Sequence, residues 1–341
     1  MRVLFAGTPE AALPSLRALI DSPDHEVVGV LTRPDARRGR GRTLSPSPVA
    51  ALARAAGLDV RTPATLRDAA ARHWVRSLGA DVAVVVAYGR IVPPALLDAP
   101  AHGWINLHFS LLPAWRGAAP VQRAVMGGDA VTGACVFRLE EGLDTGPVYA
   151  RLSEPIGPRD TGGDLLARLA DAGAPLIMGV LASLDEGTAA PVPQPEEGVS
   201  LAPPLSARDA LVTWTEAARD VDARIRALTP APGAHTSYRG VRLRLGPVEP
   251  VIGITDLPPG ALRAAGHEVL VGTGTCAVRL GRLAPAGRNW MAADAWARGA
   301  RPAHEGGQVR SCSSPGAHRW SQIASAMEIA MRTTAIRQNT H

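Results

Sequence analysis

Short apolar runs alternate with amphipathic stretches over the first half of the chain. The runs Arg2–Ala6, Glu26–Thr32 and Asp81–Ala87 predict strands, and the continuously apolar DVAVVVA predicts one buried on both faces. Apolar residues near helical spacing predict a helix over Glu10–Ile20, and Thr161–Leu184 predicts a long amphipathic helix. Strands that alternate with helices predict an α/β domain built on a doubly wound, mostly parallel sheet.

Further elements of this first domain follow the same alternation. A short helix that ends before Gly57 is predicted over Pro46–Ala56. Three more strands are predicted at Gly103–His108, Thr132–Leu139 and Pro147–Leu152.

The pattern changes after Asp185. Glu186–Pro204 is rich in Pro and lacks hydrophobic periodicity, which predicts an extended linker. A helix predicted over Thr215–Leu228 is followed by short strands that fit a small OB-like β-barrel domain. These strands are expected at His235–Leu245, Val248–Val251, Glu268–Val271 and Cys276–Leu283. The predicted domains are therefore residues 1–185, a linker 186–205, residues 206–307, and a poorly ordered tail 308–341.

Composition narrows the possible chemistry. All 36 basic Lys+Arg residues are Arg, which excludes a lysine Schiff base and a P-loop lysine. The net charge is +5 and the Arg excess lies mainly beyond residue 207, which fits either a polyanionic partner or a mildly basic solvated surface. The three widely spaced Cys fit no disulfide framework or zinc site, so we expect a reduced, cytoplasmic protein without a metal. We see no apolar run long enough to span a bilayer, and take a monomer as the simplest state.

Asn106 and His108 are the first candidate catalytic pair. Residues two apart in a strand point to one face, and open α/β sheets bind ligands at the carboxyl ends of their strands. An imidazole can move protons near pH 7, and an amide can donate to a developing oxyanion. Taken alone, the pair fits a structural Asn and a satisfied core His at least as well.

Two loops complete the candidate site. Ser110–Pro113, followed by Arg116-Gly117, is a rigid apolar loop that suits the wall of a pocket for a flat ring. Asp144 lies on a Gly-flanked turn, where it could orient His108 and stabilise its imidazolium form. A protease of the Asp-Thr-Gly type is excluded because no second such triplet is present.

In this order the three motifs, N-x-H-x-S-L-L-P-x-x-R-G and then G-L-D-T-G, resemble the 10-formyltetrahydrofolate-dependent formyltransferases. The resemblance covers the chain to about Gly307 and implies that Asn106, His108 and Asp144 form the catalytic set. It implies 10-formyltetrahydrofolate as formyl donor, with no metal. It also implies a pocket for this folate built by Val86, Ala87, Tyr88, Gly89, Ser110, Leu111, Leu112, Pro113, Glu141 and Asp144. Phe109 stands where relatives often carry a smaller residue, and we expect it to reshape the pocket edge.

Other segments, such as FAGTPE at Phe5–Glu10 and IRALTPAPGAHT at Ile225–Thr236, are similar to family members that formylate methionine on initiator transfer RNA. This resemblance implies initiator methionyl-tRNA as the partner, held in part by the OB-like domain. The cationic loop after Glu26–Thr32 suits phosphates and base edges, and the resemblance places it at the acceptor end of the RNA. Its arginines are Arg33, Arg37, Arg38, Arg40 and Arg42.

Three alternatives remain open. A related formyltransferase acting on an amino-sugar nucleotide or another small amine would use the same three residues. A nucleotide-binding oxidoreductase is disfavoured because Pro9 interrupts the glycine pattern after the first strand. A non-catalytic RNA-binding protein fits the basic charge, but aromatic residues are scarce for a stacking platform.

Overall fold

A computed structural model describes residues 1–38, 43–302 and 307–310. Two compact units are present. The first comprises residues 1–210, 219–234 and 246–249, and the second comprises residues 211–218, 235–245 and the described chain from 250 onward.

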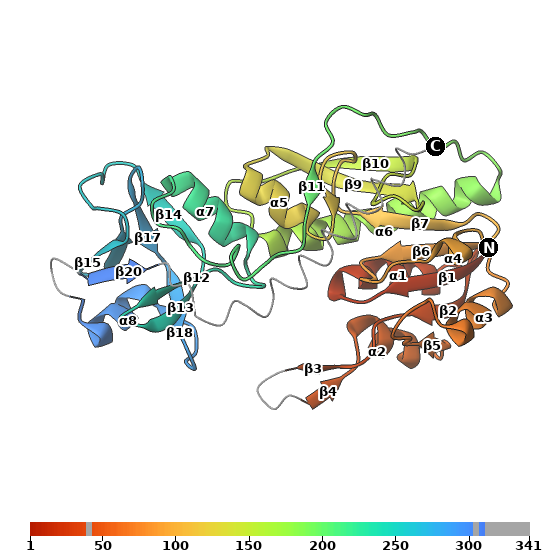
Figure 1. The fold of residues 1–341 in the computed structure, drawn as a ribbon, viewed down its shortest axis with the longest axis horizontal. Helices are drawn as coiled ribbons and strands as arrows, with labels where there is room; N and C mark the ends of the chain where they lie inside the picture. Colours follow the sequence, from red (N-terminus) through yellow and green to blue (C-terminus); the bar gives the residue numbers. More distant parts are fainter. Residues whose placement is uncertain (39–42, 303–306, 311–341) are drawn as a thin grey trace, which may run out of the picture. The chain divides into compact units, whose positions relative to one another are not determined.

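A seven-stranded sheet in the order β10-β9-β7-β6-β1-β2-β5 organises the first unit (Figure 1). The strands β1, β2, β5, β6 and β7 are parallel, while β9 and β10 are antiparallel to their neighbours. The strands are β1 (Arg2–Gly7), β2 (Glu26–Leu31), β5 (Val60–Arg61), β6 (Val82–Val86), β7 (Trp104–His108), β9 (Val131–Arg138) and β10 (Val148–Pro155). The predicted α/β class with a mostly parallel sheet is confirmed.

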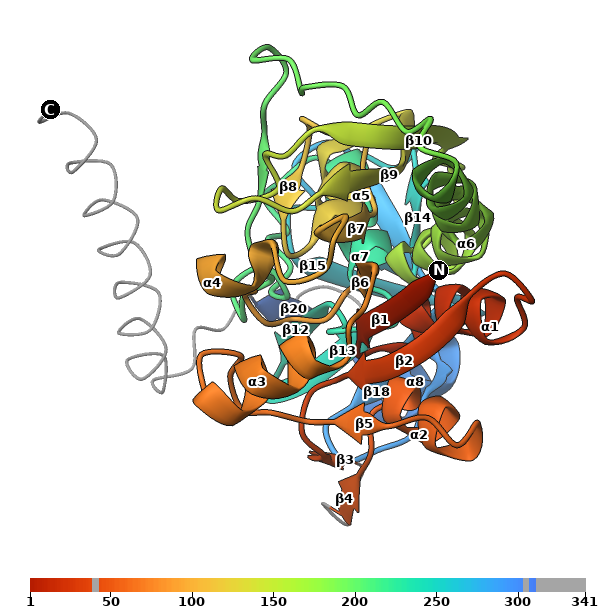
Figure 2. The same cartoon turned by 90° about the vertical axis from the view of Figure 1, so that its right-hand side faces the viewer.

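Helices cover both faces of this sheet. Figure 2 shows α1 and α6 on one side of β1 and β6, and α3 and α4 on the other. The helices described in the first unit are η1 (Glu10–Ala12), α1 (Leu13–Ile20), α2 (Pro48–Ala55), α3 (Ala69–Ser77), α4 (Pro94–Leu97), α5 (Pro120–Gly127), α6 (Gly162–Asp185) and α7 (Ala218–Ala227). Strand β6 is fully buried because Val82, Val84 and Val86 pack in one core cluster and Ala83 and Val85 in the opposite one.

The order of the strands reverses direction at β1, which makes a topological switch point. From β1 the chain proceeds to β2 and β5 on one side, and then returns to β6 and β7 on the other. Such a switch point leaves the carboxyl ends of β1 and β6 open for a ligand. Thr8 spans it by donating its hydroxyl to the Tyr88 carbonyl at 2.9 Å.

Helix α6 begins and ends within one residue of the prediction. Thr161 caps it through a capping box with Asp164. By length and composition α6 could cross a membrane, so the expectation that no run is long enough was wrong. Its buried face packs on β9, β10 and α1, which accounts for its apolar composition.

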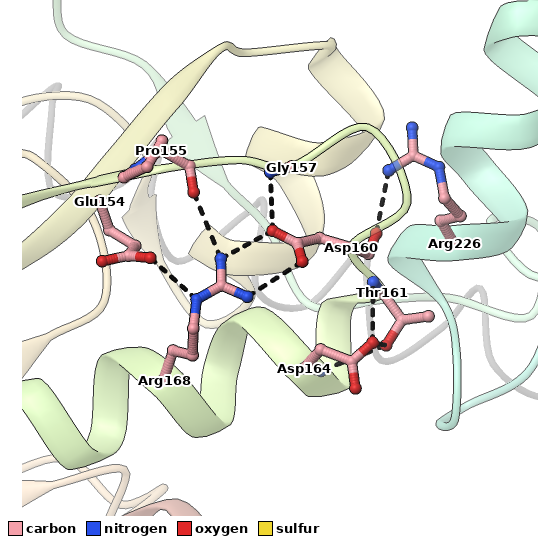
Figure 3. Close-up of polar contacts among 8 residues, drawn as sticks. All are labelled: Glu154, Pro155, Gly157, Asp160, Thr161, Asp164, Arg168 and Arg226. Atoms are coloured by element: carbon pink, nitrogen blue, oxygen red, sulfur yellow. Dashed lines mark hydrogen bonds and ion pairs between the residues drawn. The ribbon is translucent and has the colours of Figure 1, made fainter.

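A network around Arg168 fixes the start of α6 (Figure 3). The guanidinium lies 2.8 Å from Glu154 Oε1 at the end of β10 and 2.7 Å from Asp160 Oδ2 in the following loop. Arg226 of α7 donates to the Asp160 carbonyl at 2.9 Å. Helices α6 and α7 are therefore joined through one loop.

The second unit is rich in strands, as predicted. Its described strands follow the order β14-β17-β16-β15-β20-β12-β13-β18-β19, and helix α8 (Ala293–Ala300) packs on β16, β18 and β19. The strands are β12 (His235–Tyr238), β13 (Val241–Leu245), β14 (Val248–Val251), β15 (Ala261–Ala265), β16 (Glu268–Val271), β17 (Ala277–Leu280), β18 (Arg282–Pro285), β19 (Met291–Ala292) and β20 (Gly307–Arg310).

Two single strands expected in this unit are in fact pairs. His235–Leu245 is a hairpin that turns at Arg239 and Gly240, both with positive φ, as a two-residue type I′ turn requires. Cys276–Leu283 breaks at Gly281 into β17 and β18.

The predicted boundaries of the tail and linker also change. Residues 308–310 belong to β20, which pairs with β12 and β15, so the poorly ordered tail cannot begin at 308. The remainder, 311–341, lies outside the described residues. The expected linker 186–205 lies on the first unit and contains β11 (Leu201–Ala202), which pairs with β8 (Arg116–Gly117).

Candidate active site

The predicted catalytic residues meet at the carboxyl end of β7. Asn106 and His108 alternate with the core residues Ile105 and Leu107, and they point to the opposite face. Asn106 is half-buried, and its amide has no hydrogen-bond partner among the described residues. His108, the last residue of β7, is buried beside the edge of the Phe137 ring.

The hydrogen bond of His108 fixes its tautomer. Nε2 lies 2.8 Å from the Trp115 carbonyl oxygen, which can only accept, so Nε2 carries a proton in both charge states. Nδ1 is therefore the nitrogen that gains or loses a proton. It faces Asp144 Oδ2 at 3.7 Å, a distance for electrostatic attraction rather than a direct hydrogen bond.

Burial and the neighbouring carboxylate act on this imidazole in opposite directions. Burial lowers the pKa of His108 below its ordinary value, while the charge of Asp144 and the bond to Trp115 raise it. Burial dominates, so the ring is neutral at pH 7 and Nδ1 offers a lone pair. A proton accepted there would be stabilised by Asp144.

The position of Asp144 is fixed by its own backbone conformation and by a hydrogen bond from a neighbouring backbone amide. Its φ of 50° lies in the left-handed region, and its Oδ2 accepts a hydrogen bond from Gly117 N at 2.7 Å. Gly117 has a φ of 129°, and a Cβ there would lie 2.6 Å from the Ala202 carbonyl oxygen. Only glycine fits where β8 approaches β11 so closely.

The predicted folate-pocket residues divide into two groups. Val86 and Ser110 are fully buried, so they can support a pocket only from beneath. The Ser110 hydroxyl donates to the Ala114 carbonyl, and the Leu112 side chain packs against Cys135 and Phe137. Ala87, Gly89 and Glu141 are exposed, whereas Leu111 is half-buried and Pro113 buried.

The side chains of Tyr88 and Phe109 point into the core rather than toward a ligand. Tyr88 packs in the cluster that contains Leu4 and Trp104, and burial raises the pKa of its hydroxyl to about 12. Phe109 packs in the cluster on the α6 face, and its effect on the pocket edge stays a prediction.

The arginine-rich loop contains a short antiparallel hairpin, β3 (Ala36–Arg38) and β4 (Thr43–Ser45), where only a flexible loop was expected. Arg33 and Arg37 are exposed, and the aliphatic part of Arg33 lies 3.5 Å from the position of a Cβ on Gly89. Arg38 ends β3, and Arg40 and Arg42 lie outside the described residues. Within the described ranges, no group of three His, Cys, Asp or Glu could hold a metal ion.

Sequence reasoning missed several residues that support the site. The segment after α6 bonds directly to the loops of Asp144 and Trp115 through Gln194 and Ser200. Each of these residues stands in the Pro-rich segment expected to be a linker, and no local pattern distinguishes them from their neighbours.

Comparison with known proteins identifies the family of this chain. The formyl transferase family model matches residues 1–181, and the model of the formyl transferase C-terminal domain matches residues 204–301. The chain is 56% identical over 301 residues to the methionyl-tRNA formyltransferase of Salinispora arenicola (88% of this chain, 97% of that protein). It is 55% identical over 304 residues to that of Streptomyces griseus (89% and 98%).

Solved structures share the fold at low identity. An N-formyltransferase from Helicobacter canadensis, in complex with folinic acid and dTDP-3-aminofucose, superimposes with a TM-score of 0.63 at 15% identity (82% of this chain, 98% of that chain). HypX from Aquifex aeolicus, in complex with tetrahydrofolic acid, gives 0.62 at 16% identity (87% and 47%).

Fold and family matches together define a formyl transferase with an N-terminal α/β domain and a strand-rich C-terminal domain. At this identity over nearly the whole length of the relatives, the chain belongs to the methionyl-tRNA formyltransferase family.

Proposed function

We propose that this protein transfers the formyl group of 10-formyltetrahydrofolate to the α-amine of methionyl initiator tRNA in the cytoplasm. The observation that carries the proposal is the unpartnered Asn106 amide beside a neutral, carboxylate-backed His108, in a chain that matches its relatives over almost their whole length.

Each of the three residues has a role that follows from its surroundings. Asn106 donates its amide to the formyl oxygen as negative charge develops there, and such a donor contributes about 3 kcal/mol. His108 Nδ1 takes the proton that the attacking amine loses, and the Asp144 carboxylate stabilises the resulting imidazolium. Nδ1 then returns the proton to the folate nitrogen as the carbon–nitrogen bond to the formyl group breaks.

The loops at the switch point fit a folate. Ala87 and Gly89 are exposed with positive φ, and Glu141 to Leu143 are exposed on the Asp144 loop. Backbone groups on such loops can bond the polar edge of a flat ring, while the half-buried Leu111 supplies apolar surface. Folate contributes the activated formyl group, and the chain supplies orientation and proton transfer.

The arginine hairpin and the basic second unit fit the RNA part of the substrate. Arg33 and Arg37 are exposed, Arg33 lies beside Gly89 just after β6, and their guanidinium groups suit phosphates and base edges. Only the RNA substrate, and not the folate, requires them.

The test is formyl transfer from 10-formyltetrahydrofolate to methionyl initiator tRNA by the purified protein. Elongator methionyl-tRNA and a His108→Ala variant serve as controls. We expect transfer to the initiator alone and its loss in the variant. Transfer to an amino-sugar nucleotide but not to the initiator would refute the proposed substrate, and RNA binding without any transfer would indicate a non-catalytic protein.

A further inference from the structure

The segment that follows α6 is part of the scaffold of the active site. Residues 192–202, here called the strap, pair with the first unit at both ends. Val192 exchanges two backbone hydrogen bonds with Val148 at the start of β10. At the other end, the carbonyl of Ser200 accepts from Arg116 N at 2.9 Å, and that of Ala202 accepts from Ala118 N at 2.8 Å.

Gln194 bonds through one end of its carboxamide to the Asp144 loop and through the other end to Arg116 of β8. Its Nε2 donates to the carbonyls of Asp144 and Gly146, each at 2.8 Å. Its Oε1 accepts from Nε and Nη2 of Arg116, at 3.1 and 2.7 Å. The side chain thus has all its hydrogen-bonding capacity filled by two loops that lie far apart in the sequence.

These bonds close a ring around Asp144. The Asp144 carboxylate accepts from Gly117 N, Gly117 follows Arg116, Arg116 donates to Gln194, and Gln194 donates back to the Asp144 carbonyl. The ring therefore holds Asp144 by both its side chain and its backbone. Replacing Gln194 would remove the hydrogen bond that holds the Asp144 carbonyl.

We propose that Gln194 is a positioning residue for formyl transfer, which holds the Asp144 carboxylate opposite His108 Nδ1 by joining the Asp144 loop to Arg116. This inference rests on the proposed function of the site. It assigns a part in catalysis to the segment between the two domains, and it explains why that segment lies on the first unit.

The alternative is that Gln194 merely anchors the strap. Both readings predict some loss of stability when the side chain is truncated, so stability cannot distinguish them. They differ in whether the effect on the reaction depends on the charge of Asp144.

Only an amide at position 194 can make all four bonds. Gln194→Ala removes them, while the isosteric Gln194→Glu retains an acceptor for Arg116 but turns an oxygen toward the carbonyls of Asp144 and Gly146. The Glu variant therefore tests the hydrogen bonds to the Asp144 loop independently of the hydrogen bonds to Arg116.

The experiment compares Gln194→Ala, Gln194→Glu and Asp144→Asn, alone and as the double variant Gln194→Ala/Asp144→Asn, in the full chain. Glu196→Ala is the matched control, since Glu196 is exposed on the same segment. Formyl transfer to methionyl initiator tRNA gives kcat and KM. Thermal unfolding shows whether each variant is folded, and NMR follows the titration of His108.

We expect both Gln194 variants to lower kcat roughly ten- to a hundredfold with little change in KM for the RNA, because small misplacements of catalytic groups cost this much. In the Asp144→Asn background, Gln194→Ala should change kcat less than about threefold, because residues that act through one another are not additive. The titration midpoint of His108 should fall in Gln194→Ala, toward that of Asp144→Asn, and stay unchanged in Glu196→Ala.

Wild-type kcat in Gln194→Ala would overturn the proposal. So would an equal factor of decrease in kcat when Gln194→Ala is introduced into the wild-type and the Asp144→Asn chains. If the wild-type chain itself formylates no RNA, the proposed function fails, and the His108 titration alone then decides. An unchanged midpoint in Gln194→Ala would overturn the positioning role, and a lowered one would support it.

Discussion

Replacing Asp144 by Asn removes one charge and almost no volume from the active site. The Gly117 amide can still donate to the Asn side-chain oxygen, so we expect the loop and the stability of the protein to change little. What is lost is the attraction between the carboxylate and the protonated imidazole of His108.

The magnitude follows from the separation of the two groups. At 3.7 Å, with an effective dielectric constant of about 20, this attraction is worth at most about 4.5 kcal/mol. With each ~1.4 kcal/mol equal to a tenfold change in rate, we expect Asp144→Asn to lower kcat about a hundred- to a thousandfold. The pKa of His108 should fall further, because the group that raises it against burial has lost its charge.

The assay is single-turnover formyl transfer as a function of pH, with Asp171→Asn, an exposed substitution on α6, as the matched control. In the pH–rate profile of the wild type, we assign the acidic limb to His108. The midpoint of this limb should lie below the ordinary pKa of histidine. A loss of less than tenfold in Asp144→Asn, or a rise in the titration midpoint of His108, would refute the assignment of Asp144 as the electrostatic partner.

Three other substitutions test separate parts of the structure. Asn106→Ala should lower kcat by about 10²–10³ and leave the melting temperature unchanged, because its amide bonds no other described residue; a lowered melting temperature with normal kcat would make Asn106 structural. Arg168→Gln should cost about 1 kcal/mol in chemical denaturation, since this side chain is 41% exposed, while kcat stays normal. Arg168 holds the pKa of Asp160 below its ordinary value, so the contribution is present above pH ~4 and is lost as pH falls through the lower folded pKa; a pH-independent difference would contradict this. Arg37→Ala should weaken RNA binding and reduce the slope of log K against log salt by about 0.7–0.9, as filter binding at several salt concentrations would show; equal weakening at every salt concentration would argue against a phosphate contact.

The main sheet and the placement of the candidate residues Asn106 and His108 could be predicted from the sequence because their signals are local. A continuous apolar run specified β6, and the period of two in Asn106-Leu107-His108 placed an amide and an imidazole on one face. Helix α6 was predicted within one residue at each end from its amphipathic pattern, and the structure adds the capping box of Thr161 and Asp164 at its start. The approach of Asp144 to His108 was expected from its Gly-flanked turn and from the resemblance to the family, and the structure places the two groups 3.7 Å apart.

The features that were missed depend on pairing between distant segments. Strands β8 and β11 have two residues each, too few to show any period, and they pair across more than eighty positions. The sequence did not show that the Tyr88 ring enters the core, because a loop residue between Ala87 and Gly89 gives no indication of which face its side chain takes. The pocket role of the backbone at this loop stays a prediction. The turn at Arg239 was overlooked because Arg is not a residue that favours positive φ.

The position of β20 has a consequence for how the protein is made. This strand stands between β15 and β12, so it joins two groups of strands that are otherwise separate in the order of the sheet. A ribosome completes both groups before it reaches residues 307–310, and until then the edges of β12 and β15 are open to pairing with other chains. A premature stop just before Gly307 would therefore leave the triad and the strap intact but release a protein prone to aggregate through its second unit.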